Sequence, residues 1–236
     1  MSLLEIEDLR TGYGALPVLQ GISFNVAEGE TCVMFGLNGA GKTTTVNCLA
    51  GLLPVWGGEI RFDGKLVSGK KPDEIVALGM ALSPEGRRVF PQLSVLTNLK
   101  LGAWTKRKSK VEVAETIERV FSYFPRLEER KDQLAGTMSG GEQQMLAIGR
   151  AYMSRPRLLM IDEASLGLSP KLAQTVFQVV SQINDDGTTV VMVEQNVGVL
   201  PYADQALIME KGTLTYDGRG EELEKSGELR TTYLGA

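Results

Sequence analysis

The sequence predicts an α/β fold with a mostly parallel sheet as its core, an N-terminal antiparallel β-subdomain and an inserted α-helical subdomain. Three observations predict it. Short apolar runs separated by Gly or Asp-Gly dominate the first 65 residues, and continuous apolar runs recur further along the chain. Helically spaced apolar residues lie between these runs, above all from about residue 95 to 150. Strands that alternate with helices indicate a parallel sheet whose two faces are covered.

The antiparallel β-subdomain is predicted from alternation near the start of the chain. Residues 4–9, 22–26 and 59–62 alternate between apolar and polar side chains, as half-buried strands do. Asp63-Gly64, which follows the third of these segments, is a dipeptide typical of hairpin turns. We expect this subdomain, together with the loop after residue 35, to occupy about residues 1–65 of one domain that spans residues 1–236.

The core strands and the inserted helices have different patterns. Residues 31–35, 158–161 and 188–193 are apolar runs, as parallel strands buried on both faces are. The α-helical subdomain is expected over about residues 86–150. Residues 151–236 should complete the core and add a C-terminal hairpin and a polar helix. One inserted helix is indicated by apolar residues at helical spacing, namely Val113, Ile117, Val120, Phe121 and Phe124.

Composition limits the class of protein. With 43% hydrophobic and 23% charged residues the chain is globular. Its net charge of -4 argues against a nucleic-acid partner, which would require a basic surface. Histidine is absent, which excludes a histidine base or a histidine metal ligand. Cys32 and Cys48 lack metal-ligand spacing, and we expect buried free thiols, with a disulfide as the alternative.

Residues 36–43 read Gly-Leu-Asn-Gly-Ala-Gly-Lys-Thr and match the phosphate-binding pattern G-x-x-x-x-G-K-[ST] in full. The motif follows a predicted buried strand and precedes a predicted helix. Its glycines let backbone N–H groups converge on phosphate oxygens, and the helix adds its positive end. Lys42 would bridge the β- and γ-phosphates, Thr43 would bind Mg²⁺ and Thr44 would touch the α-phosphate. The residues expected around the phosphates are Gly36, Asn38, Gly39, Ala40, Gly41, Lys42, Thr43 and Thr44.

Two adjacent acids end another predicted buried strand. Asp162 and Glu163 follow residues 158–161, at the end of a parallel strand where ligand sites of such sheets lie. Buried acids are unfavourable unless they are paired or bind metal. We therefore assign Asp162 to Mg²⁺, through water, and Glu163 to polarising the attacking water; two exposed acids are the alternative. The two motifs together predict the core of a RecA-like P-loop NTPase.

A third motif distinguishes among the P-loop families. No Asn-Lys-x-Asp motif, which reads guanine, is present, and this argues against a GTPase. Met-Ser-Gly-Gly-Glu at residues 138–142 opens a predicted helix and resembles the Leu-Ser-Gly-Gly-Gln signature of the ABC ATPase family. An ordinary serine N-cap is the alternative for this segment alone. The resemblance implies ATP as the nucleotide and a head-to-tail dimer, in which ATP on one subunit meets the other subunit's Ser139, Gly140, Gly141 and Glu142.

Three more residues match positions of the ABC ATPase family. Tyr13 stands where these ATPases place an aromatic ring that stacks on adenine; a buried strand residue is the alternative. Glu85 stands where most members carry a Gln that senses Mg²⁺ and contacts the membrane subunit. Gln195 replaces the usual switch His, and its amide can donate to the γ-phosphate but cannot titrate. The resemblance therefore implies Lys42, Gln195 and Glu163 as the catalytic residues, with Glu163 as the base.

The resemblance also extends beyond the catalytic motifs. Residues 165–168 match the family's loop that crosses the dimer, although Ala164 replaces the usual Pro. Several segments are similar to the LivF-type ATPases of bacterial branched-chain amino acid importers, namely residues 84–90, 124–127, 135–151 and 193–196 and the closing Tyr-Leu-Gly at 233–235. The similarity therefore covers essentially the whole chain.

A LivF-type ATPase would power the uptake of branched-chain amino acids from the cytoplasmic face of the membrane. The implied partners are two membrane permease subunits, a second ATPase subunit that is identical or a sister chain, and an extracytoplasmic substrate-binding protein. No apolar stretch reaches 18 residues and no signal peptide is visible, so the membrane span would belong to a partner. Amide or urea import, lipid export and a soluble ABC ATPase acting on ribosomes or DNA are the alternatives.

Overall fold

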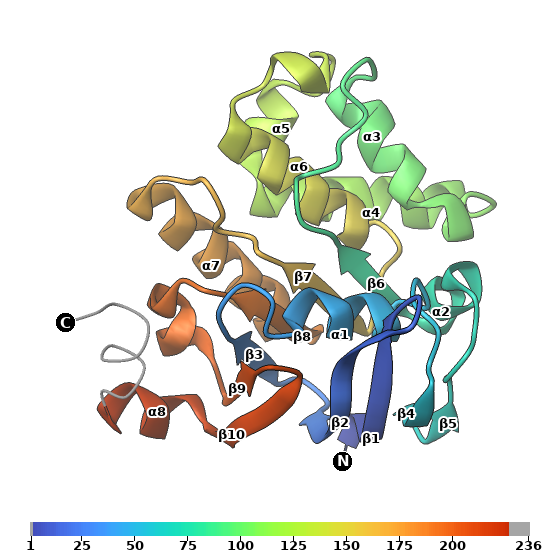
Figure 1. The fold of residues 1–236 in the computed structure, drawn as a ribbon. Helices are drawn as coiled ribbons and strands as arrows, with labels where there is room; N and C mark the ends of the chain where they lie inside the picture. Colours follow the sequence, from blue (N-terminus) through green and yellow to red (C-terminus); the bar gives the residue numbers. More distant parts are fainter. Residues whose placement is uncertain (1, 227–236) are drawn as a thin grey trace.

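The computed structural model describes residues 2–226, which form two sheets with helices between and around them (Figure 1). The first sheet is antiparallel, with the strand order β2-β1-β4-β5. Its strands include the alternating segments predicted from the sequence, and Asp63-Gly64 forms the turn between β4 and β5 as expected. The strands are β1 (Ser2–Tyr13), β2 (Leu16–Ala27), β4 (Gly57–Phe62) and β5 (Lys65–Leu66).

The second sheet has six strands in the order β10-β9-β3-β8-β7-β6, all parallel except β10. Its three central strands, β3, β8 and β7, are buried over their whole length, because helices or the first sheet cover both faces. The predicted hairpin turns at Lys211-Gly212 between β9 and β10. The strands are β3 (Thr31–Phe35), β6 (Met80–Ser83), β7 (Leu158–Asp162), β8 (Thr189–Glu194), β9 (Gln205–Glu210) and β10 (Thr213–Arg219).

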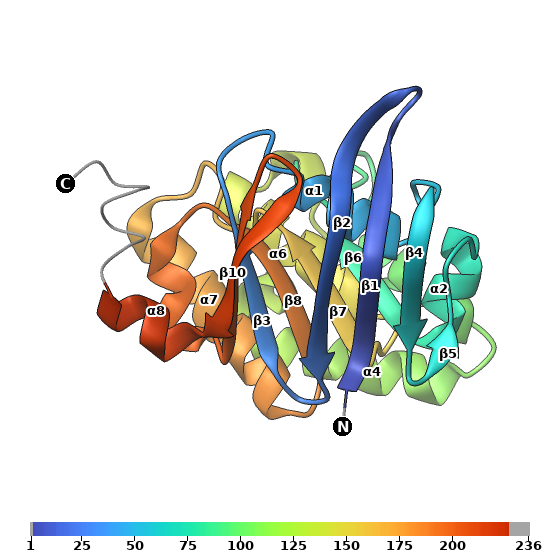
Figure 2. The ribbon, with the colours of Figure 1, turned by 60° about the horizontal axis from the view of Figure 1, so that its bottom comes forward.

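Helices occupy three regions of the molecule. In the views of Figures 1 and 2, α1 lies between the two sheets, and α3 to α6 form a separate layer beyond β6 and β7. α7 and α8 complete the core after the second acid motif. The helices are α1 (Lys42–Leu49), α2 (Pro72–Leu78), α3 (Val95–Gly102), α4 (Lys110–Tyr123), α5 (Pro125–Glu129), α6 (Gly140–Tyr152), α7 (Pro170–Asp185) and α8 (Gly220–Ser226), with 3-10 turns η1 (Trp104–Lys106), η2 (Ala135–Thr137) and η3 (Val197–Tyr202).

The six-stranded sheet separates two apolar cores. Successive side chains of a strand point to opposite faces, so Cys32 and Met34 pack on the first sheet and α1, whereas Val33 and Phe35 pack towards the helical layer. Both cores are continuous across β3, β7 and β8. The sheet is therefore held on both sides, and the ends of its central strands form a rigid platform for side chains. Cys32 and Cys48 are buried free thiols, as expected.

The structure corrects the predicted elements at two points. Phe124 has helical spacing from Phe121 but lies just outside α4, because a residue that precedes proline is disfavoured in the helical conformation and Pro125 follows it. β6 was not predicted, because its four residues are too short a run to have a recognisable period. The predicted polar helix at the C-terminus is confirmed as α8, whereas Tyr-Leu-Gly at 233–235 lies outside the described residues.

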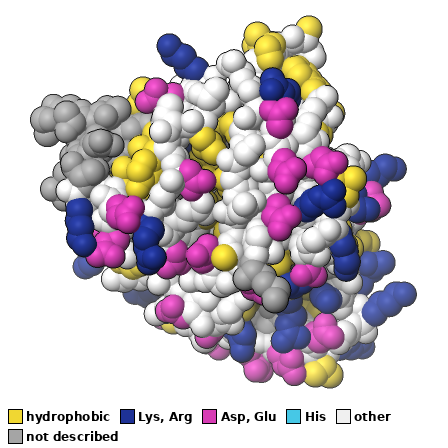
Figure 3. All heavy atoms as spheres, turned by 90° about the horizontal axis from the view of Figure 1, so that it is seen from below, with side chains coloured by type: hydrophobic (Ala, Val, Ile, Leu, Met, Phe, Trp, Pro, Cys, Tyr) yellow, Lys and Arg dark blue, Asp and Glu magenta, His cyan; other side chains and the backbone are white. Residues whose placement is uncertain are grey.

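The outer surface around the first sheet is charged. On the face that Figure 3 shows, acidic and basic side chains are mixed over the strands. Two ion pairs of the first sheet, Arg10 with Asp8 on β1 and Arg61 with Glu59 on β4, are largely exposed. Exposed pairs of this kind contribute about 0–1 kcal/mol each to stability. None of the helices in residues 2–226 combines the length and the apolar composition needed to cross a membrane.

Candidate active site

The phosphate-binding motif forms the loop between β3 and α1. Gly41 precedes the helix with a φ of 111°, a conformation that favours glycine, and a Cβ there would lie 2.8 Å from Leu19 Cδ2. The first turn of α1 has no acidic residue and no side-chain cap, so its N–H groups are available to an anion. Lys42 is buried, and its Nζ donates to the carbonyl oxygen of Gly36 at 2.7 Å. Loop, lysine and helix end therefore converge as a phosphate site requires.

Asp162 lies at the end of β7, next to the first turn of α1. The Thr43 hydroxyl donates to Asp162 Oδ1 at 3.1 Å. Burial raises the pKa of Asp162 to about 6; the Thr43 bond opposes this shift, and the nearby Glu163 and Glu85 add to it. The carboxylate is thus buried beside two other acids, with Lys42 acting in the opposite direction, and a further cation would favour its charged form.

Glu163 occupies a strained position beside Asp162. Its φ is 49°, in the left-handed region that residues other than glycine rarely adopt. The Gln195 amide donates to Glu163 Oε1 at 2.5 Å and to Asn38 Oδ1 at 3.0 Å. Lys42 Nζ lies 3.8 Å from the same Glu163 oxygen, and the charge of Glu163 partly offsets the lowering of the Lys42 pKa by burial. A carboxylate, an amide and an ammonium therefore surround the space beside the loop.

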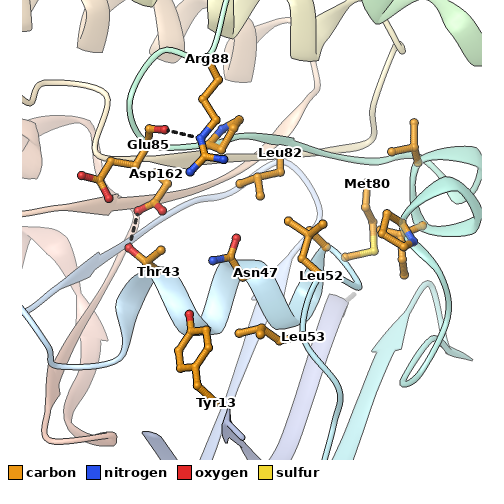
Figure 4. Close-up of a pocket in the computed structure, with 15 residues that line it drawn as sticks. Tyr13, Thr43, Asn47, Leu52, Leu53, Met80, Leu82, Glu85, Arg88 and Asp162 are labelled. Atoms are coloured by element: carbon orange, nitrogen blue, oxygen red, sulfur yellow. Dashed lines mark hydrogen bonds between the residues drawn. The ribbon is translucent and has the colours of Figure 1, made fainter.

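A cavity of about 400 Å³ lies beside α1 (Figure 4). It is lined by Tyr13, Thr43, Glu85 and Asp162, which come from four separate segments of the chain. Tyr13 is 50% exposed, so the alternative of a buried strand residue is wrong. Most of the remaining lining is apolar, which suits a flat ring of the size of adenine.

The acids of this cavity fit Mg²⁺ in number and kind. Mg²⁺ keeps several waters and binds through one or two carboxylates together with substrate phosphates. Asp162 and Glu85 supply two carboxylates, and Thr43 supplies a hydroxyl between them and the loop. Within residues 2–226 no group of three or more His, Cys, Asp or Glu side chains is close enough to hold a metal ion by itself. The phosphates of a nucleotide would therefore have to complete the coordination.

The third motif starts α6. Ser139 caps the helix, and its hydroxyl donates to Glu142 Oε2 at 2.8 Å while the Ser139 N–H donates to the same oxygen at 2.9 Å. Glu142 also pairs with Arg130 at 2.9 Å. A Cβ at Gly141 would lie 2.0 Å from Leu172 Cδ2, so a larger residue there would require the Leu172 side chain to move. The segment is thus a serine N-cap whichever function it serves.

The third motif and the phosphate loop do not form one site within the chain. No residue of 138–142 lines the cavity that Tyr13, Thr43 and Asp162 share. In Figure 1, α6 lies in the helical layer, and α1 lies against the sheets. Ser139 is exposed at the start of α6, where a nucleotide held by a second subunit would be within its reach.

Sequence reasoning missed several polar side chains near the site. Asn47 and Arg88 line the cavity, and Arg88 Nε donates to the carbonyl oxygen of Glu85 at 3.2 Å (Figure 4). Glu194, the last residue of β8, is buried and binds Ser165. The rule that acids at carboxyl ends of parallel strands mark sites, applied to Asp162, would also have selected Glu194. Arg88 and Asn47 carry no comparable signal in the sequence.

Comparison with known proteins decides the family. The family model described as ABC transporter matches residues 19–166, which include the phosphate loop, the third motif and both acids. The chain belongs to the ABC transporter family. As an ABC ATPase it binds ATP and hydrolyses it, and this hydrolysis is coupled to transport.

Curated relatives and solved structures of other proteins match this ABC ATPase over 99–100% of its chain. The chain is 42% identical to the high-affinity branched-chain amino acid transport ATP-binding protein BraG of Pseudomonas aeruginosa, over 99% of the chain and 100% of the relative. It is 34% identical to the probable branched-chain amino acid transport ATP-binding protein LivF of Archaeoglobus fulgidus, over 99% of each. The ADP conformation of MJ1267, an ATP-binding cassette of an ABC transporter, superposes with a TM-score of 0.86 at 28% identity, covering 100% of both chains.

Proposed function

We propose that the chain is the ATP-hydrolysing subunit of an importer for branched-chain, hydrophobic amino acids. The observation that carries the proposal is the assembly beside the phosphate loop, in which Thr43 binds Asp162 and Gln195 binds Glu163. The assignment of the cargo rests on two relatives that the chain matches over 99–100% of their length, one a branched-chain amino acid transport ATP-binding protein and the other a probable one.

Each side chain of the site has a distinct role in this proposal. Lys42 leaves the Gly36 carbonyl and binds the β- and γ-phosphates, while Tyr13 stacks on adenine. Thr43 and Asp162, with Glu85 beside them, hold Mg²⁺, which supplies positive charge to the phosphate oxygens. Glu163 accepts a proton from the attacking water, and Gln195 donates its amide hydrogen to the γ-phosphate.

A second ATPase subunit completes the site. In a head-to-tail dimer, the Ser139 hydroxyl, the Gly141 N–H and the positive end of α6 from one subunit would reach the γ-phosphate on the other. Ser139 is exposed at the start of α6 and no residue of 138–142 lines the chain's own cavity, which supports this arrangement. Two ATP molecules would then close the dimer, and their hydrolysis would reopen it.

An apolar groove is the proposed contact with the membrane permeases. It has a volume of about 460 Å³ and lies between the helical layer and β6. Phe90, Leu101 and Trp104 line it and are 48%, 38% and 63% exposed. Large exposed apolar side chains around a groove favour an amphipathic helix of a partner. We propose that this partner is a permease helix, which would hold the chain on the cytoplasmic face while an extracytoplasmic protein delivers substrate to the permeases.

The groove can be tested separately from catalysis. Trp104→Ala should reduce co-purification with the permeases from detergent-solubilised membranes and leave the ATPase rate of the isolated chain unchanged. Leu66→Ala is the control, because Leu66 is 47% exposed on β5 and is not part of the groove. Equal recovery of permeases with both variants would contradict the proposed contact.

The cargo is tested by uptake in cells that lack this chain. Labelled leucine uptake should be lost, restored by the wild-type chain and not restored by Glu163→Gln. Urea and short-amide uptake in the same cells should be unaffected. A loss of urea or amide uptake with normal leucine uptake would contradict the proposed cargo and indicate urea or amides instead. A defect in lipid export alone would contradict import and indicate an exporter.

A further inference from the structure

Glu194 is a buried acid that the proposed catalytic steps do not use. It ends β8, its side chain is 1% exposed, and both of its carboxylate oxygens bind Ser165. The Ser165 N–H donates to Oε1 at 3.0 Å, and the Ser165 hydroxyl donates to Oε2 at 2.6 Å. No cation among the described residues lies within salt-bridge distance of this carboxylate, although its charge acts on Lys42. One buried side chain therefore fixes both the backbone and the side chain of a loop residue.

The next residue along the chain makes the corresponding contact with Glu163. Gln195 donates to Glu163 Oε1, while the Glu163 N–H donates to the carbonyl oxygen of Val193 at 2.9 Å. Two consecutive residues after Val193 thus hold two residues of one short segment, with Glu194 on Ser165 and Gln195 on Glu163. Orientation of the base and orientation of the loop depend on the same strand end.

The loop that Glu194 holds reaches the surface immediately after Ser165. Leu166 is 52% exposed. The loop has two internal backbone bonds, from Leu166 N–H to Glu163 and from Leu168 N–H to Ser165. These bonds close turns within the segment, but neither ties it to β8. Glu194 supplies that attachment through the two bonds to Ser165.

A carboxylate at this point is unfavourable for folding alone. Burial raises the pKa of Glu194 to about 7, although the Ser165 hydrogen bonds act in the opposite direction. A buried carboxylate that has no ion pair lowers stability, whereas an apolar side chain in the same place would not. A role in positioning the loop would explain why an acid occupies this position.

We infer that Glu194 is a positioning residue, which fixes the loop of residues 165–168 relative to Glu163 and Gln195 for contact with the second ATPase subunit. This inference rests on the proposed function, because the loop needs a partner subunit to act on. A change in the Gln195–Glu163 contact when ATP binds would move the same strand end and hence the loop. Loss of Glu194 should then impair turnover by the dimer and spare the binding of ATP to each subunit.

The test compares steady-state ATP hydrolysis by the full chain and its variants. Glu194→Ala should lower kcat by at least about tenfold with KM for ATP within about twofold, as expected for a small displacement of groups around the reacting atoms. Glu194→Gln should recover most of kcat, because its amide oxygen can still accept from the Ser165 N–H. Asp204→Ala is the control. Asp204 also accepts a hydrogen bond from a backbone N–H, that of Thr31 at 2.9 Å, but Thr31 begins β3 and the phosphate loop follows the other end of that strand.

Dependence on protein concentration separates positioning from a general loss of structure. Specific activity of the wild type should rise with chain concentration as the dimer forms, and Glu194→Ala should require a higher concentration when both proteins are assayed well below their melting temperatures. If Glu194→Ala does not fold, Ser165→Ala gives the answer, because it removes only the hydroxyl bond and should lower kcat without raising KM.

The outcomes distinguish failure of the inference from failure of the proposed function. Wild-type kcat and concentration dependence in folded Glu194→Ala, or in Ser165→Ala where the first variant does not fold, would remove the role of Glu194 and leave the ATPase intact. A wild-type chain without ATP hydrolysis would instead overturn the proposed function together with the inference.

Discussion

The side-chain amide of Gln195 donates a hydrogen bond of 2.5 Å to Glu163 Oε1. The same amide donates to Asn38 in the phosphate loop at 3.0 Å, so Gln195 joins the loop to the acid that follows β7. An amide keeps its hydrogens at every pH, and the chain has no histidine. Glu163 is therefore the group at this position that can take a proton from water.

Replacing the amide by an acid should disable the site. Gln195→Glu would put a second carboxylate in contact with Glu163, and two carboxylates at this distance do not both ionise. We expect kcat to fall by about 100-fold or more, the scale of losing general base catalysis. Gln195→Asn, which is shorter but neutral, should lose less. Equal rates for the two variants would contradict a charge effect and indicate a purely steric one.

Lys42→Ala should weaken the binding of ATP. A hydrogen bond to a charged group contributes about 1.5–3 kcal/mol, so losing the ammonium should raise Kd for ATP by roughly 10- to 150-fold. Titration of the variant with a fluorescent ATP analogue measures this change. Lys131→Ala, at an exposed position, serves as the control. Unchanged affinity in Lys42→Ala would place the phosphates elsewhere.

The ring of Tyr13 should contribute to affinity through stacking. Stacking of a base on an aromatic side chain contributes about 1–3 kcal/mol, which predicts a rise of roughly 5- to 150-fold in Kd for Tyr13→Ala. Tyr13→Phe keeps the ring and should bind ATP as the wild type does. If Phe lost as much affinity as Ala, the hydroxyl rather than the ring would be the group that matters.

The buried Glu194 should also make stability depend on pH. Its pKa is raised from 4.5 to about 7, so between these values the folded chain holds a proton that the unfolded chain has lost. The contribution of this group to stability is therefore fully present below pH 4.5 and falls as the pH rises to 7. The total decrease is about 3 kcal/mol, and above pH 7 the contribution stays constant. Glu194→Gln removes this dependence.

Denaturant unfolding between pH 4.5 and pH 8 measures the effect. The unfolding free energy of Glu194→Gln minus that of the wild type should increase towards pH 7 and then stay level. The buried Asp162, whose pKa is also raised, is present in both proteins and cancels in this difference. A difference that is independent of pH would contradict the shifted pKa of Glu194.

Local motifs explain how much of the site was predictable. Residues 36–43 carry the whole phosphate loop in one segment, and residues 158–163 combine a buried strand with its two terminal acids. Each motif has a fixed position relative to a strand, and the phosphate loop also precedes a helix. The motifs therefore predicted β3, β7 and the start of α1 directly. The burial of both faces explains why these strands were recognisable.

Contacts across the fold could not be predicted in the same way. The Gln195–Glu163 and Glu194–Ser165 contacts join residues about 30 positions apart, and they depend on β7 and β8 being neighbours in the sheet. The groove of Phe90 and Trp104 likewise depends on how the helical layer packs on β6. A sequence period identifies one element at a time and contains no information about which elements pair.

The most direct test of the account is ATP hydrolysis by the purified chain with Mg²⁺, compared with Glu163→Gln. The variant should bind ATP with an affinity close to that of the wild type, form a stable dimer with ATP and hydrolyse it about 100- to 10,000-fold more slowly, because it lacks the base. Phosphate release by the variant at the wild-type rate would contradict the assignment of Glu163 and the mechanism built on it.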